Sequence, residues 1–436
     1  MAVIWRKMKD IKKNDKDIRQ MTRIVHATSV HNPFDSRILY RECIWLAKSG
    51  YEVFLTAPAE FSERQVKNVK ILGVKKHTKL WFKKLCGSVK PNLSHVSRLK
   101  RPLIWLEILK KIYRLDPDIV HIHDPELLII APFIKVLQLL RNFRLLSIFK
   151  PIGVQGHKKV KIIYDVHEYF VESIVDKFWI PLKFRKMAAL FASWIEFFLG
   201  IWVDGQVFVV SGQIPYYLRW KTLKAIVHNY PDLDKFPMNC RYRTNKYEKF
   251  TLVHIGSLYE RRGIMTMLEA LKLLNEGGYD VNLILGGIFE SKEFRFRVED
   301  FIEANNLESN VEISDWIDYP VLNQYLARAH AAWLAIYPSR QYSRQSISTK
   351  QLEAMAAGLP VICSDIPSLT RFTEEAACGI SVPAKDAAAH ADAVKRLYDN
   401  PEQAKKMGIN GHNLVAEKFN WHTEASDLIN FYSNLL

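Results

Sequence analysis

The sequence predicts two α/β units, each built on a parallel β-sheet. Short apolar runs alternate with helical patterns along most of the 436 residues, which is the order that parallel strands with crossover helices require. The alternation breaks in a polar stretch at 239–249 and then restarts, and the chain is too long for a single hydrophobic core. A pair of such units normally binds its ligand in the cleft between them, at the carboxyl ends of the strands.

In the first unit, apolar runs bounded by polar or turn residues predict the strands. These runs lie near 23–30, 52–57, 118–124, 161–167, 206–211 and 225–229. Between them, apolar residues at helical spacing predict helices at 36–48 and 102–114.

In the second unit, the same reasoning predicts a further set of strands. They lie near 251–256, 281–286, 311–314, 332–336, 361–364 and 380–382. The expected organisation is a basic N-terminal extension at 1–20, a first domain at 21–235, a second domain at 236–420, and a terminal helix at 421–436 that crosses back to the first domain.

The segment 348–365 packs a helix, a glycine stop and a buried strand into a short stretch of sequence. Ser348 or Thr349 can cap the helix. Lys350 lies in the first turn, where the positive end of the helix favours an anion such as a diphosphate. One turn later, Glu353 could accept hydrogen bonds from sugar hydroxyls. The pattern favours a nucleotide-sugar site, and the alternative is an ordinary αβ unit with a solvated glutamate.

The charge is unevenly distributed along the chain. The first 230 residues contain 40 Lys and Arg against 19 Asp and Glu, whereas the rest contain 22 against 27. A basic half of this size favours a polyanion or an anionic membrane face as a neighbour. The basic and aromatic stretch at 178–203 could lie in a lipid interface, or it could be a core helix with a basic rim. We expect no nucleic acid, because neither zinc-finger spacing nor an aromatic RNA-binding signature accompanies the charge.

The cysteines and the N-terminus bear on where the protein resides. Five cysteines lack any C-x-x-C spacing, which indicates a reducing compartment without a zinc site. The first residues are too charged for a signal peptide, and no run approaches the roughly 18 apolar residues that a membrane span requires. We therefore expect a cytoplasmic protein with peripheral contact to the inner face of the membrane.

Several polar side chains follow expected strands of the first unit. His123 lies in a His-x-His-Asp sequence directly after an apolar run, with His121 expected to face the sheet interior. His167 and Glu168 end another strand, where they could line an acceptor site or form a structural pair. Arg37 lies on the segment after the first strand. His121, His123 and Asp124 are also residue types that can bind a metal ion.

Taken together, these segments resemble the GT-B glycosyltransferases, and in particular the retaining family 4 enzymes, also called glycosyl transferases group 1. The resemblance runs from about Arg23 to Leu436. It is carried by segments 29–37, 120–128, 164–168, 254–264 and 350–361.

The resemblance implies two Rossmann-like domains whose parallel sheets face a central cleft, and transfer of a sugar from a nucleoside diphosphate sugar to a hydroxyl. Arg262 and Lys350 would hold the diphosphate beside Gly256, Glu353 would bind the ribose, and His123 would contact the donor sugar. On the donor side, Trp316 and Ile317 would lie near the base.

The resemblance further implies that Arg37, His167 and Glu168 lie on the acceptor side. It implies no metal and no cofactor, since the nucleotide sugar is a co-substrate. The acceptor would be a saccharide or a lipid-linked saccharide of cell-surface polysaccharide synthesis.

Two positions depart from the family pattern. The first glutamate of the family's glutamate-x7-glutamate pattern is Gln345 here, and Ser257 stands where many members have arginine. These departures leave open a catalytically silent GT-B scaffold or partner subunit and, as a lesser option, a sugar-nucleotide epimerase.

Overall fold

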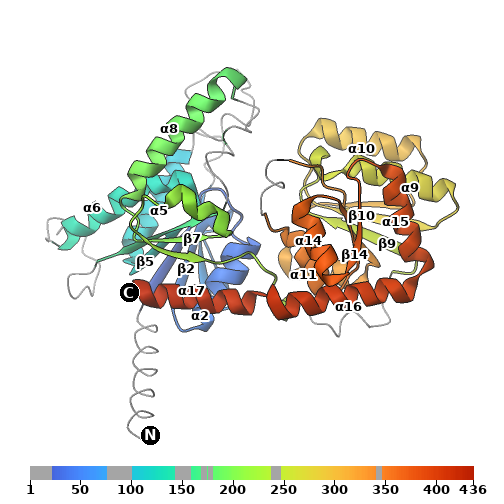
Figure 1. Cartoon of the computed structure of the whole chain (residues 1–436). Coiled ribbons are helices and arrows are strands. Elements are labelled where there is room, and N and C mark those ends of the chain that lie inside the picture. Colours follow the sequence, from blue (N-terminus) through green and yellow to red (C-terminus); the bar gives the residue numbers. More distant parts are fainter. Residues whose placement is uncertain are drawn as a thin grey trace, which may run out of the picture. The chain divides into compact units, whose positions relative to one another are not determined.

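A computed structural model describes residues 22–75, 101–142, 159–167, 174, 180–236, 247–339 and 346–436. It divides into two compact units (Figure 1). The first comprises the residues up to His228 together with Ala425–Leu436, and the second comprises Asn229–Glu424. Both are α/β units with parallel sheets, as the sequence predicts.

The first unit contains an eight-stranded sheet in the order β3-β4-β2-β1-β5-β6-β7-β8. Its pairs are parallel except for β3 and β4 at one edge. The strands are β1 (Arg23–Ala27), β2 (Glu52–Pro58), β3 (Glu63–Val66), β4 (Val69–Val74), β5 (Ile119–Ile122), β6 (Lys161–Val166), β7 (Gly205–Phe208) and β8 (Leu223–Ile226). Strands β1 and β5 are buried along nearly their whole length, because helices cover both faces of a parallel sheet.

The helical segments of the first unit follow the strands at their carboxyl ends. They are η1 (Ser36–Cys43), α2 (Ile44–Lys48), α5 (Arg101–Leu115), η2 (Pro125–Ile130), α6 (Ala131–Asn142), α8 (Leu182–Gly200) and η4 (Ser211–Tyr217). The helix expected at 36–48 is divided, since η1 is wound as a π-helix and only α2 is an α-helix.

The terminal helix α17 (Trp421–Leu435) contributes its residues from Ala425 onward to the first unit. A Cβ atom on Gly205 of β7 would lie 2.7 Å from the Phe431 ring. The sheet therefore needs a glycine where this helix lies on it.

The second unit contains a six-stranded sheet in the order β11-β10-β9-β12-β13-β14. The strands are β9 (Phe250–Ile255), β10 (Val281–Gly286), β11 (Val311–Ser314), β12 (Ala331–Leu334), β13 (Val361–Ser364) and β14 (Gly379–Val382). Every pair is parallel.

Helices cover the second sheet on both faces. They are η7 (Glu260–Arg262), α9 (Ile264–Glu276), α10 (Lys292–Ala304), α11 (Tyr319–Arg328), α13 (Thr349–Ala356), α14 (Pro367–Ala376), α15 (Ala387–Asp399) and α16 (Pro401–Lys418). The short η5 (Leu233–Lys235) precedes them.

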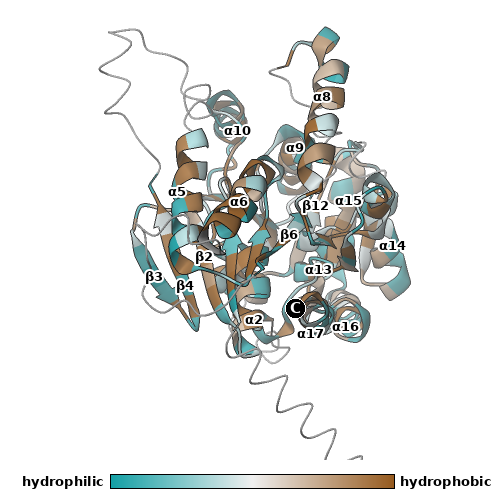
Figure 2. Cartoon of the chain, turned by 90° about the vertical axis from the view of Figure 1, so that its left-hand side faces the viewer, coloured by the Kyte–Doolittle hydropathy of each residue, from teal (hydrophilic) through white to brown (hydrophobic). Residues whose placement is uncertain are grey.

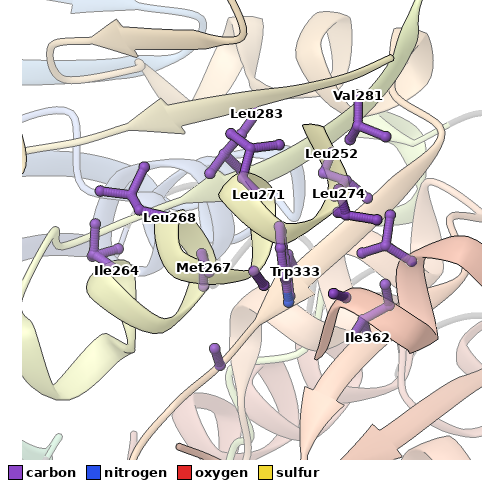
Figure 3. Packing of buried hydrophobic residues seen from close by; sticks show 14 of the residues in the cluster. Leu252, Ile264, Met267, Leu268, Leu271, Leu274, Val281, Leu283, Trp333 and Ile362 are labelled. Carbon is purple, nitrogen blue, oxygen red and sulfur yellow. The ribbon is translucent and has the colours of Figure 1, made fainter. Parts of the chain in front are cut away.

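The core of the second unit forms where α9 packs on the sheet (Figure 3). Met267 and Leu271 of α9 meet Leu283 and Trp333 of the sheet, and all four are buried. The Trp333 indole donates to His390 Nδ1 at 3.0 Å, so the buried N–H has a partner. This rigid layer fixes the strand ends that carry the candidate site.

No helix in the described ranges is both long and apolar enough to cross a membrane.

Candidate functional site

The strand order of the second unit locates its most favourable ligand position. From β9 the chain proceeds to β10 and β11 on one side, and it then returns to β12 on the other side of β9. In open α/β sheets, ligands bind at the carboxyl ends of the strands, next to such a reversal. The segments that follow β9 and β12 are therefore the expected ligand-binding segments of this unit.

Two glycines at the ends of β9 and β10 bring the backbone of their loops into close approach. Gly256 N donates to Gly286 O at 2.7 Å. Gly256 and Gly287 have φ values of +149° and +150°, and a Cβ atom on Gly287 would lie 1.6 Å from Gly256 O. Only glycine fits these positions, so the two loops pack closely beside β9.

The Lys350 side chain occupies the space that the missing Gly256 side chain leaves. A Cβ atom on Gly256 would lie 2.1 Å from Lys350 Nζ. The lysine lies in the first turn of α13, which Ser348 caps by accepting from Gln351 N at 3.4 Å. Burial and the charge of Arg262 lower the pKa of Lys350, and the charge of Glu353 opposes this. A bound anion would restore the pKa of this ammonium group.

Arg262 supplies a second cation from the segment after β9. It ends η7 directly before Gly263, which has φ +73° and lies so close to β12 that a Cβ atom would be 1.8 Å from Ala335 O. Burial and the charge of Arg261 lower the pKa of Arg262 to about 10, so it stays protonated at neutral pH. Two cations thus lie near the N-termini of α9 and α13, where helix dipoles favour an anion.

The remaining donor-side candidates lie on the same unit. Glu353 is 8% exposed in α13, one turn after Lys350. Ile317 lies against the end of β10, where a Cβ atom on Gly286 would be 2.4 Å from Ile317 Cδ1. Trp316 beside it is 56% exposed, and its indole donates to Asp318 at 3.1 Å. The structure brings Gly256, Arg262 and Lys350 together, whereas Gln345 lies outside the described residues.

In the first unit, His123 lies inside a buried polar network. It is 1% exposed. Its Nδ1 lies 3.1 Å from both Asp165 Oδ2 and His167 Nε2, and its Nε2 lies 2.9 Å from His26 Nδ1. Burial lowers its pKa to about 4, against the opposing effect of Asp165. His123 is therefore a neutral imidazole in the interior, and its proposed contact with the donor sugar stays a prediction.

Arg37 also lies in the interior. Its guanidinium contacts Asp165 at 3.0 and 3.1 Å and Glu42 at 2.9 Å, and it donates to Val227 O at 3.0 Å. Burial opposes ionisation of Asp165, but the charge of Arg37 holds its pKa well below the usual range. Burial and the charge of Asp165 raise the pKa of Glu42 well above the usual range. Arg37 thus neutralises Asp165 beneath the surface that the sequence analysis assigned to the acceptor.

His167 is the member of this network that reaches the surface. Its side chain is 18% exposed, and Nε2 lies 2.9 Å from Asp165 Oδ2. Its ring centroid lies 5.1 Å from that of His31. Glu168, the other residue expected here, lies outside the described residues.

The sequence analysis missed His31. Its side chain is 32% exposed, with Nδ1 3.6 Å from Asp35 Oδ2 and Nε2 3.5 Å from Asp124 Oδ1. Burial opposes protonation, yet the hydrogen bond to Asp35 and the charges of Asp124 and Asp35 raise the pKa of His31 to about 9. The surface edge of the first unit therefore presents a charged imidazole beside His167.

His121 shares the face of β5 that carries His123, and its Nδ1 lies 2.6 Å from Tyr432 OH. The same hydroxyl lies 3.4 Å from His26 Nε2. The sequence analysis expected only His121 to face the interior. The fold also brings His26 and Tyr432 to it.

Two groups in this network have metal-ligand chemistry. The first is His26, His121 and His123 with Glu42, and the second is His123 with Asp165 and His167; within each group the ligand atoms lie within 4.8 Å of one another. Arg37 already compensates Asp165, and a dication would lie close to this fixed positive charge. In the second group, short polar contacts and the ion pair with Arg37 link the side chains. In the first group, Glu42 pairs with Arg37 at 2.9 Å.

Part of the chain that carries this geometry matches a known protein family. Residues 241–414 match the family model for glycosyl transferases group 1. Alpha-D-kanosaminyltransferase from Streptomyces kanamyceticus is 24% identical over 42% of this chain and 45% of its own length. The chain thus spans about half the length of the curated relatives that it matches.

Solved structures match over nearly the whole chain. Sucrose-phosphate synthase from Thermosynechococcus elongatus has a TM-score of 0.65 at 18% identity and covers 95% of this chain and 99% of its own. HepE from Anabaena, solved in complex with UDP and glucose, has a TM-score of 0.62 at 12% identity, with coverage of 94% and 99%. Residues 241–414 are therefore a glycosyl transferases group 1 domain, within a chain that has the GT-B fold.

Proposed function

We propose that this protein is a retaining glycosyltransferase that moves a sugar from a nucleoside diphosphate sugar to a hydroxyl of a saccharide or lipid-linked acceptor. The observation that carries the proposal is the arrangement of Lys350 and Arg262 around Gly256, at the strand reversal of the second unit. Similarity to HepE, which was solved with UDP and glucose, supports a nucleotide-sugar ligand.

The chemistry at this site is departure of a diphosphate. The bond between the anomeric carbon and the phosphate oxygen breaks, and its electron pair stays with the nucleoside diphosphate. The acceptor hydroxyl forms the new bond on the same face of the sugar, and its proton passes to the leaving phosphate oxygen. Lys350 and Arg262 stabilise the charge that grows on the diphosphate, while Glu353 accepts hydrogen bonds from the ribose hydroxyls.

The first unit is proposed to bind the acceptor. His31 and His167 are two partly exposed imidazoles at its strand ends, and they contact the carboxylates of Asp124 and Asp165. The ring nitrogens of two imidazoles could hydrogen-bond sugar hydroxyls. The proposed place of action is the cytoplasmic face of the membrane, in polysaccharide synthesis.

Thermal unfolding with UDP, GDP and ADP tests the donor assignment, because a ligand that binds the folded state raises the melting temperature. We expect one nucleotide to raise it, and we expect Arg262→Ala to abolish most of the shift. Arg261→Ala is the matched control, since Arg261 lies over the Tyr259 ring at 5.5 Å. Equal shifts for the two variants would refute the diphosphate role of Arg262.

A second candidate is a catalytically silent GT-B protein that acts as a scaffold. Ser257 favours it, because it follows Gly256 where an arginine would add a third cation. Mass spectrometry of a panel of sugar nucleotides, incubated with the protein and with saccharide acceptors, distinguishes the two. Nucleotide binding without hydrolysis or transfer would support the scaffold.

A further inference from the structure

Helix α8 of the first unit carries a long stripe of exposed aromatic and aliphatic side chains. Phe191, Trp194 and Phe198 are 68%, 57% and 54% exposed. The exposed large side chains of this helix and the turn after it are Leu182, Phe184, Met187, Leu190, Phe191, Trp194, Ile195, Phe198, Ile201 and Trp202. Their spacing of three and four residues places many of them along one side of the helix. Figure 2 shows α8 largely in the colour of hydrophobic residues.

The opposite side of α8 is firmly packed, so the exposure is a property of the folded unit. Glu196 is buried and accepts from the hydroxyls of Tyr164 at 3.1 Å and Tyr217 at 2.8 Å. Gly200 lies against Trp220, where a Cβ atom would be 2.0 Å from the ring. The helix is therefore held by one narrow face, and its apolar stripe points away from that face.

The charges of α8 all have the same sign wherever they reach the surface. Lys183, Arg185 and Lys186 lie near its N-terminus. Its one acidic residue, Glu196, is turned into the protein. The surface of α8 thus combines an apolar stripe with cations alone, as in helices that lie in the interface of anionic bilayers.

We propose that α8 docks this protein on a bilayer that contains anionic lipids, with the aromatic stripe inserted between the headgroups and the basic turn beside them. Trp and Phe bury their rings readily at this depth. A second copy of this helix fits less well, because it offers the same cations and no exposed acidic side chain to pair with them. Helix α6 supports the assignment, since Phe133, Val136 and Leu139 are also exposed along it and both α6 and α8 pack on η2.

This docking would bring the first unit to a lipid-linked acceptor, and that part of the inference rests on the proposed function. The docking itself depends only on α8. The two are separable by experiment, because nucleotide binding belongs to the second unit.

Co-sedimentation of the full chain with vesicles of phosphatidylcholine, with and without phosphatidylglycerol, tests the proposal. We expect binding to the anionic vesicles that weakens with added salt. Phe191→Glu should weaken it by more than about tenfold, since an inserted aromatic side chain contributes a factor of roughly that size. Replacing Lys183 and Lys186 by Gln should weaken it by about fivefold for each lysine.

Phe296→Glu is the matched control. Phe296 lies on α10 of the second unit and is 68% exposed, as is Phe191. This variant should bind vesicles like the unaltered protein, and all variants should retain the melting temperature and its shift by nucleotide.

Three results would overturn the proposal. The first is a failure of the unaltered protein to sediment with anionic vesicles. The second is equal binding by the Phe191→Glu and Phe296→Glu variants. The third is a dimer in light scattering that Phe191→Glu converts to a monomer, because a second copy would then cover the stripe. An absent nucleotide shift with intact vesicle binding would instead refute only the proposed function.

Discussion

The two units use charge in opposite ways at the carboxyl ends of their strands. In the first, Arg37 is buried against Asp165, and each compensates the other inside the protein. In the second, Lys350 and Arg262 lie near each other. Burial and the charge of Arg262 lower the pKa of Lys350, and the charge of Glu353 opposes this. The first arrangement holds the fold together, whereas the second leaves a positive field that a diphosphate would satisfy.

Arg37→Ala is the substitution with the largest expected effect, and it tests the contrast between the two units directly. The change leaves the Asp165 carboxylate buried without its cation, and we expect the free energy of unfolding to fall by about 3 to 5 kcal/mol. Urea unfolding measures it. A loss below about 1 kcal/mol, the range of exposed pairs, would show that this ion pair does not hold the first unit together.

The complementary change in the second unit is Lys350→Met, which keeps the apolar stem and removes the charge. Nucleoside diphosphate affinity should fall by about 1.5 to 3 kcal/mol, the usual contribution of a hydrogen bond to a charged group. Stability without ligand should hold or rise, because burial disfavours the ammonium group. Calorimetry with the nucleotide and urea unfolding without it give the two values, and a drop in both would contradict a binding role.

Tyr432→Phe tests how α17 is joined to the histidine network. The hydroxyl lost is the one 2.6 Å from His121 Nδ1, and its removal should cost about 1 kcal/mol of unfolding free energy. Tyr398→Phe on the partly exposed face of α15 is the control and should stay within about 0.5 kcal/mol. Equal effects would mean that the buried hydroxyl contributes nothing specific.

The smallest expected effect concerns pH and His31. The pKa of His31 is raised from 6.5 to about 9, so its ion pair stabilises the fold fully below pH 6.5 and is lost as the pH rises through 9. His31→Asn should therefore destabilise the protein at pH 6, by up to about 1 kcal/mol for a partly exposed pair, and hardly at pH 10. Urea unfolding at both values measures this, and a pH-independent difference would contradict the raised pKa.

Sequence reasoning located most strands well because their signal is local. The bounds of β11 and β13 are those expected, 311–314 and 361–364. Ser348 caps α13 as expected, and Gly358, with φ +70°, follows the end of the helix. Strands β3 and β4 were both missed. Glu63–Val66 is a polar edge strand without an apolar period, and Val69–Val74, which pairs with it, was not among the predicted strands although most of it is buried. The π-helical turn at Ser36–Cys43 was also missed, because its side-chain pattern is that of a helix.

The sequence by itself determined the α/β class and the two units, and it supplied the lysine, arginine and glutamate of the proposed donor site, because periodicity, capping and strand-end placement depend on neighbours along the chain. Only the tertiary structure decided which charges meet. Arg37 and Asp165 are 128 residues apart, and His121 and Tyr432 are 311 apart. Such pairs form because a buried polar group without a partner costs free energy. Their partners lie far apart in the sequence, so no local sequence pattern predicts them.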